Sequence, residues 1–131
     1  MARHVKEMIR THPGATRFDE DALERCIRAC FECAQTCTTC ADACLEEETV
    51  AELRECIRRN LDCADVCDIT GRVLSRVGEE EIQDVLLEAC RLACRLCAEE
   101  CERHAETHEH CRVCGEACRE CEEACNALVA A

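Results

Sequence analysis

The apolar positions of this chain recur in steps of three and four, and many of them hold cysteine. Three long runs carry the pattern, from Cys26 to Cys44, from Cys90 to Cys101 and from Cys111 to Cys125. Such steps place side chains along one stripe of an α-helix and leave the other faces to polar residues. The pattern predicts amphipathic helices whose inward stripe is sulfur, where an ordinary helix bundle has leucine.

These helices and the short connections between them predict an all-α fold. Short connections make sequential helices antiparallel neighbours, which gives an up-down-up-down four-helix bundle with a cysteine-lined core. A short amphipathic helix over residues 2–11, ended by Pro13 and Gly14, precedes the bundle. We predict a single domain over residues 1–131, with an N-terminal extension over 1–17 and bundle helices over 19–45, 50–77, 80–105 and 108–129.

Residues that favour helix ends mark several of these boundaries. Asp19 is a good N-cap for the first bundle helix. Thr49 and Glu52 have the spacing of a capping box at the start of the second, and Gly78 suits the position after its end.

Matching the inward positions of four antiparallel helices by height predicts a stack of layers that turns every cysteine inward. The first layer holds four leucines, Leu23, Leu74, Leu87 and Leu128. The next layers are Cys26, Thr70, Cys90 and Cys125; Cys30, Cys67, Cys94 and Cys121; Cys33, Cys63, Cys97 and Cys118; Cys37, Asn60, Cys101 and Cys114; Cys40, Cys56, His104 and Cys111; and Cys44, Leu53, His108 and Thr107.

The two ends of this stack differ in chemistry. The leucine layer closes one end, and Val73, Val77, Ile82 and Leu86 are expected near it. The other end carries three histidines, His104, His108 and His110, and we expect metal ions to enter there. Met8 would reach that end if the N-terminal helix folds back along the bundle.

Composition and charge exclude several classes of protein. The chain has 29 acidic and 16 basic residues and a net charge of −13, which disfavours binding to nucleic acid or an anionic membrane. No apolar run approaches the roughly 20 residues that span a bilayer. The N-terminal sequence MARHVKEMIRTHPG lacks the features of an export signal. We therefore expect a cytosolic protein with reduced thiols.

Disulfide bonding does not account for the cysteines. Disulfide-rich domains are short, secreted and rich in loops. Cβ atoms four residues apart on a helix are about 5–6 Å from each other, whereas a disulfide needs about 3.8 Å. An enzyme is also not indicated, because a thiol oxidoreductase needs one cysteine of low pKa with a resolving partner, and these cysteines are nearly equivalent.

The spacing favours soft metal ions. Eight Cys-x-x-x-Cys pairs place two thiolates one helical turn apart, an arrangement that suits Cu(I), which prefers sulfur and accepts two or three ligands. Eighteen thiolates would take the net charge from −13 to −31, which about one monovalent ion per thiolate would cancel. A metallothionein-like buffer of zinc or other soft metals remains the alternative, because two predicted layers hold four cysteines each and zinc prefers four ligands.

The paired cysteines on four helices, the missing export signal and the cluster of His104, His108, His110 and Cys111 resemble the bacterial copper storage proteins, specifically their cytosolic branch. The resemblance covers the chain after about residue 18. It implies storage and detoxification of cytosolic copper as many Cu(I) ions bound to thiolates, and assembly as a homotetramer. A copper chaperone or a low-molecular-weight thiol would load the protein.

Four residues other than cysteine are candidate metal ligands. His104 and His108 continue the sulfur stripe of the third bundle helix, and imidazole binds copper well. His110 lies off the stripe in a turn. Asn60 takes an inward position among cysteines, where its amide either fixes the register of the helices or contacts metal.

Overall fold

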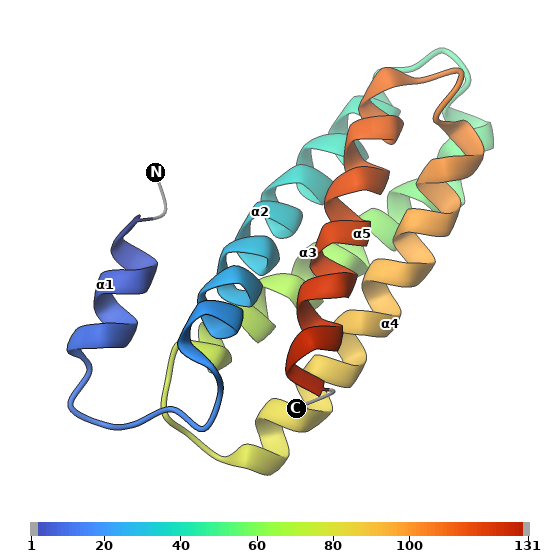
Figure 1. Ribbon diagram of the computed structural model, residues 1–131. Coiled ribbons are helices and arrows are strands. Elements are labelled where there is room, and N and C mark those ends of the chain that lie inside the picture. Colours follow the sequence, from blue (N-terminus) through green and yellow to red (C-terminus); the bar gives the residue numbers. More distant parts are fainter. Residues whose placement is uncertain (1–2, 130–131) are drawn as a thin grey trace.

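The structure, a computed structural model, describes residues 3–129, and its fold is the expected all-α bundle. Helices α2 to α5 run up and down in turn, and α1 lies beside α2 (Figure 1). Each bundle helix packs against two neighbours, α2 against α3 and α5, and α4 against the same two. The elements are α1 (Arg3–Thr11), α2 (Glu20–Leu45), the 3₁₀ helix η1 (Val50–Leu53), α3 (Arg54–Leu74), α4 (Glu80–His104) and α5 (Glu109–Val129). Residues 1–2 and 130–131 of the predicted ranges lie outside the described residues.

One of the three predicted helix ends is confirmed. The carboxylate of Asp19 accepts a hydrogen bond from the backbone N–H of Ala22 at 3.0 Å and caps α2. The capping box at Thr49 is wrong, because the Thr49 side chain makes no capping bond. Its carbonyl accepts from the N–H of Glu52 at 2.9 Å, so the chain enters α3 through a 3₁₀ turn.

The prediction that Gly78 follows the end of α3 is also wrong. The helix ends at Leu74, and the backbone N–H of Ser75 bonds to the carbonyls of Gly71 and Arg72. The Ser75 hydroxyl donates to the Gly71 carbonyl at 2.7 Å and satisfies the last turn locally. Gly78 therefore lies in the connection to α4.

The inward orientation of all eighteen cysteines is confirmed. Each is at most 2% exposed, and together they form most of the core. Protonated cysteine packs as a small apolar side chain, so burying the stripe stabilises the bundle much as a row of alanine or valine would. The sulfur stripe is therefore also the packing surface of the four helices.

The leucine layer lies where it was expected, but its surroundings differ. Leu23, Leu74, Leu87 and Leu128 are all buried. Val77 and Ile82 are 51% and 53% exposed, so they do not help to close this end. Gln83 is buried in their place, because its amide donates to the Arg76 carbonyl and accepts from the Arg17 guanidinium, both at 3.2 Å.

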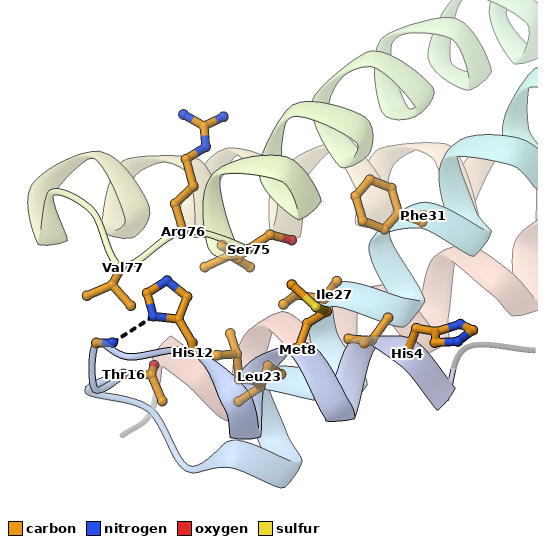
Figure 2. A pocket seen from close by; sticks show the side chains of 14 residues that line it. His4, Met8, His12, Thr16, Leu23, Ile27, Phe31, Ser75, Arg76 and Val77 are labelled. Carbon is orange, nitrogen blue, oxygen red and sulfur yellow. Dashed lines mark hydrogen bonds between the residues drawn. The ribbon is translucent and has the colours of Figure 1, made fainter.

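Helix α1 packs against α2 near the leucine layer, far from the histidine end (Figure 1). A pocket of about 340 Å³ separates it from the start of α2 and the end of α3. Figure 2 shows Met8 beside Leu23 and Ile27 in this pocket, and His12 accepting a 2.8 Å hydrogen bond from the Gly14 backbone. The idea that Met8 reaches the histidine end is therefore wrong.

The leucine layer gives a test of how the fold is stabilised. We expect Leu87→Ala, which opens a cavity at a side chain that is 1% exposed, to lower the free energy of unfolding by about 3 kcal/mol. Val85→Ala on the same helix removes a side chain that is 68% exposed and should cost less than about 0.5 kcal/mol. Urea unfolding of the reduced metal-free protein, followed by circular dichroism, measures both. Equal losses would show that the leucine layer is not a packed core.

Candidate functional site

The cysteine thiols form one continuous network through the bundle. Sγ atoms on neighbouring helices lie 3.6 Å apart at Cys67 and Cys94, and 3.8 Å apart at Cys26 and Cys125. Sγ atoms one turn apart on a helix are just as close, 3.7 Å at Cys33 and Cys37. Thiols in the centre of the bundle, such as Cys33 and Cys67, therefore have sulfur neighbours both along their own helix and across the core.

The sulfurs gather in groups of four that cross the predicted layers. Four such groups are Cys30, Cys90, Cys121 and Cys125; Cys33, Cys67, Cys94 and Cys121; Cys33, Cys37, Cys63 and Cys118; and Cys37, Cys97, Cys114 and Cys118. The predicted layers are correct in order but wrong in being flat. Side chains lean toward the N-terminus of their own helix, so those of α2 and α4 lean toward the leucine layer and those of α3 and α5 lean away from it.

The sulfur spacing fits metal ions. With a metal–thiolate distance of about 2.3 Å, as for zinc, two sulfurs are about 4.0 Å apart in a trigonal site and about 3.8 Å apart in a tetrahedral site. The Sγ atoms lie 3.6 Å apart at Cys37 and Cys118 and 4.0 Å apart at Cys30 and Cys90, and the ligand atoms of each group of four lie within 4.8 Å of one another. A linear two-coordinate site needs about 4.6 Å, which small rotations of the side chains would supply. The sulfur spacing therefore suits three- and four-coordinate ions directly, and two-coordinate ions after side-chain rotation.

Asn60 interrupts the sulfur stripe of α3 and is fully buried. Its Oδ1 atom accepts hydrogen bonds from the thiols of Cys97 at 3.0 Å and Cys114 at 3.1 Å, and a longer one from Cys101 at 3.7 Å. Its Nδ2 group donates to the sulfur of Cys56 at 3.6 Å. The amide oxygen thus points at three cysteines and takes the place of a sulfur in the network.

We call one end of the bundle the mouth. It lies opposite the leucine layer and contains the turns 46–49 and 105–108. Here His110 joins Cys40, Cys44 and Cys111 in a group that could hold a metal ion. The Nδ1 atom of His110 lies 3.4 Å from Sγ of Cys40 and 3.7 Å from Sγ of Cys111. The mouth therefore offers a mixed sulfur and nitrogen site at the top of the thiol network.

The other two histidines of the mouth lie against carboxylates. The Nε2 atom of His104 is 3.0 Å from Glu100, which is itself buried, and Nδ1 of His108 is 3.0 Å from Glu47. Because His104 and His108 continue the sulfur stripe of α4, the sequence predicted that they lie nearer to the thiols than His110 does. The structure instead brings His110 against the thiols. The first turn of α5 directs it inward, a placement that a stripe drawn along α4 could not reveal.

Burial and neighbouring groups shift the pKa values at the mouth. Burial raises the pKa of the Cys44 thiol, and negative charge on Cys56 or Cys40 raises it further. Burial lowers the pKa of His110, but hydrogen bonds to Cys40 and Glu47 outweigh this effect and the pKa is raised. The same contact with His110 lowers the pKa of Glu47, so this carboxylate is ionised and acts as an acceptor.

The helices of the described chain carry no stretch long and apolar enough to cross a membrane. Their outer faces instead hold rows of ion pairs, such as Arg119 with Glu102 and Glu122, both at 2.9 Å.

Chemical modification should reveal which thiol meets solvent first. Cys40 is 2% exposed, whereas its neighbours Cys44 and Cys111 are fully buried, and hydrogen bonds from Cys101 and Cys111 lower its pKa. Because the thiolate is the reactive form, we expect brief treatment of the reduced metal-free protein with iodoacetamide to modify Cys40 before the other cysteines. Fragment-ion mass spectrometry locates the label, and urea-unfolded protein is the control. Earlier labelling of a central thiol such as Cys33 would contradict the arrangement of the mouth.

Comparison with known proteins places these features in a family. The profile of the copper storage protein family matches residues 19–130. The copper storage protein Ccsp from Streptomyces lividans, loaded with 10 copper equivalents, is 52% identical, with a TM-score of 0.94 over 96% of this chain and 98% of that one.

Two further structures are similar. A cytosolic copper storage protein from Streptomyces lividans with five coppers is 55% identical, with a TM-score of 0.83 over 85% of this chain and 94% of that one. The Cu(I)-bound copper storage protein BsCsp3 is 32% identical, with a TM-score of 0.75 over 82% of this chain and 98% of that one. With a profile match over nearly its whole length and a bundle filled with thiols, this chain belongs to the copper storage protein family.

Proposed function

We propose that this chain stores many Cu(I) ions on the thiolates that line its bundle, for detoxification or supply of copper. The observation that carries the proposal is the continuous sulfur network, in which neighbouring groups of four share members such as Cys37 and Cys118. Shared sulfurs suit clusters of ions bridged by thiolates, because each thiolate contacts more than one ion. Membership of the copper storage protein family supports the same function.

Charge balance favours monovalent copper over zinc. When Cu(I) replaces a thiol proton, the charge of the core does not change, so loading leaves the net charge near −13. Zinc replaces the protons of four thiols with two positive charges and leaves each four-sulfur site negative. Buried charge of this kind is costly without partners, and the core around the central groups consists of other cysteines.

The metal-free bundle is expected to be folded before loading. Protonated thiols pack as apolar groups, and the sulfurs already lie at distances that metal ions require. Copper would therefore enter a preformed tube, in contrast to zinc fingers, which fold only with metal. The eighteen cysteines are the proposed ligands, since each is buried within the network.

The mouth is the proposed route of copper into the tube. His110 would ligate through Nδ1 together with Cys40 and Cys111, the two sulfurs nearest to it. His104 and His108 would receive ions on their way inward. Farther down, the Oδ1 atom of Asn60 would act as a weak oxygen ligand beside Cys97 and Cys114, whose thiols donate hydrogen bonds to it in the metal-free protein.

The cellular setting is proposed from the same features. A cytosolic location would keep the thiols reduced, and a copper chaperone or low-molecular-weight thiol would deliver Cu(I) without releasing free ion. Leu61 and Leu92 are 47% and 48% exposed on the outer faces of α3 and α4, which supports a homo-oligomer, by family resemblance a tetramer. The acidic surface disfavours nucleic acid and anionic membranes as partners.

Anaerobic titration with Cu(I) tests storage directly. We expect the reduced metal-free protein to take up on the order of one Cu(I) per thiolate and to release about one proton per ion, with helicity unchanged by circular dichroism. A competing chelator reports the free ion. Saturation near four or five ions, with Zn(II) bound to the same extent, would instead indicate a general soft-metal buffer.

A pair of variants tests the role of Asn60. We expect Asn60→Ala to lower the affinity of the Cu(I) sites beside residue 60 by about tenfold, because an amide oxygen that faces three thiols is lost. Thr70→Ala is the matched control, since Thr70 interrupts the same stripe but its hydroxyl bonds to the Val66 carbonyl at 2.7 Å. Competitive chelator titrations compare the two. Equal effects would mean that Asn60 serves packing alone.

A further inference from the structure

We propose that Glu47 is a positioning residue that holds His108 and His110 in opposite tautomers, so that Cu(I) passes from one imidazole to the other and then to the thiolates. The proposal rests on the proposed storage of Cu(I) and adds the group that prepares the mouth for uptake. It assigns a role to a carboxylate on the turn after α2, outside the cysteine and histidine pattern.

The geometry begins with a single oxygen atom. Oε2 of Glu47 lies 2.8 Å from Nε2 of His110 and 3.0 Å from Nδ1 of His108. The two imidazole rings stack with centroids 5.6 Å apart and planes 24° from parallel. One carboxylate on the α2 side of the mouth thus contacts different ring nitrogens of two histidines on the α4–α5 side.

When the rings are neutral, which for His110 requires a pH above its raised pKa, these contacts determine which nitrogen of each ring carries the proton. An ionised carboxylate only accepts hydrogen bonds, and a neutral imidazole has one N–H and one lone pair. His108 must therefore be protonated at Nδ1, which leaves Nε2 free to bind metal. His110 must be protonated at Nε2, which leaves Nδ1 free.

The free nitrogen of His110 is the one that faces sulfur. Its Nδ1 atom lies 3.4 Å from Sγ of Cys40 and 3.7 Å from Sγ of Cys111. The other tautomer would point an N–H at these sulfurs and block the approach of a cation. Glu47 therefore prepares His110 as an Nδ1 ligand and leaves His108 with its other nitrogen available to an incoming ion.

The third histidine of the mouth shows the same arrangement. Oε2 of Glu100 lies 3.0 Å from Nε2 of His104, and Glu100 is only 3% exposed. All three imidazoles of the mouth thus have one nitrogen on a carboxylate. Carboxylates that bind the far nitrogen of a metal-ligating histidine commonly fix its tautomer and orientation.

Nitrogen-15 NMR of the metal-free wild-type protein tests the tautomers directly. Long-range ¹H–¹⁵N correlations, recorded at a pH above the raised pKa of His110 so that both rings are neutral, should show His108 protonated at Nδ1 and His110 protonated at Nε2. Loss of signals in His108→Ala and His110→Ala assigns the rings. The same tautomer in both rings would overturn the proposal.

Uptake kinetics test the consequence of these tautomers. We expect Glu47→Ala to slow Cu(I) uptake from a bicinchoninate complex by about tenfold, because the tautomers are no longer held. Glu47→Gln should stay near the wild-type rate, since its amide oxygen can still accept from both rings. Glu46→Ala, on the same turn and exposed, is the control for a lost charge.

The outcomes separate positioning from simpler roles. A Glu47→Gln rate as low as that of Glu47→Ala would mean that charge alone matters, and an unchanged Glu47→Ala rate would remove Glu47 from uptake; either overturns the proposal. The tautomer measurement needs no copper, so it is independent of the storage function. High copper capacity with unchanged rates would leave storage intact and reject the role of Glu47 only.

Discussion

The architecture depends on one constraint, that the same side chain must pack the core as a thiol and bind metal as a thiolate. Cysteine meets both requirements because a protonated thiol is a small apolar group and a thiolate is a soft ligand. The contacts between neighbouring Sγ atoms, such as 3.6 Å at Cys37 and Cys118 and 4.0 Å at Cys30 and Cys90, suit both states, since they are van der Waals contacts in the metal-free protein and close to the edges of a trigonal or tetrahedral metal site. In the proposed loading, a bundle built on this constraint would need no hinge or lid.

The constraint also explains why the polar groups are at one end. A leucine layer at the other end, closed by the buried amide of Gln83, gives the bundle ordinary hydrophobic packing that does not change with metal content. The mouth has the opposite character, because in the proposed uptake it would offer ligands to an ion that still carries part of another ligand shell. Histidines held by carboxylates would meet this need, since their free nitrogens would be directed before the ion arrives.

Much of this organisation follows from residue spacing alone. Steps of three and four define a stripe on each helix, and four stripes of matching length can face one another in few registers, so the inward cysteines and the leucine layer were predictable. Helix ends were harder: Ser75 ends α3 through its own hydroxyl, and a 3₁₀ turn replaces the capping box at Thr49. Both depend on local hydrogen bonds that compete with the patterns typical of caps.

The sequence predicted cysteine as the ligand type of the site, but it did not predict which cysteines gather into each group of four. A drawing of flat layers ignores the lean of side chains toward each helix N-terminus, and this lean makes Cys33 and Cys37 members of two groups of four each. That sharing bears on metal identity. A divalent ion bound by four sulfurs of its own uses cysteines that the neighbouring group of four also needs. Isolated zinc sites therefore compete with one another for sulfurs along the tube. Monovalent ions bridged by shared thiolates do not compete in this way, and each ion that enters leaves both the charge and the packing of the next group nearly unchanged.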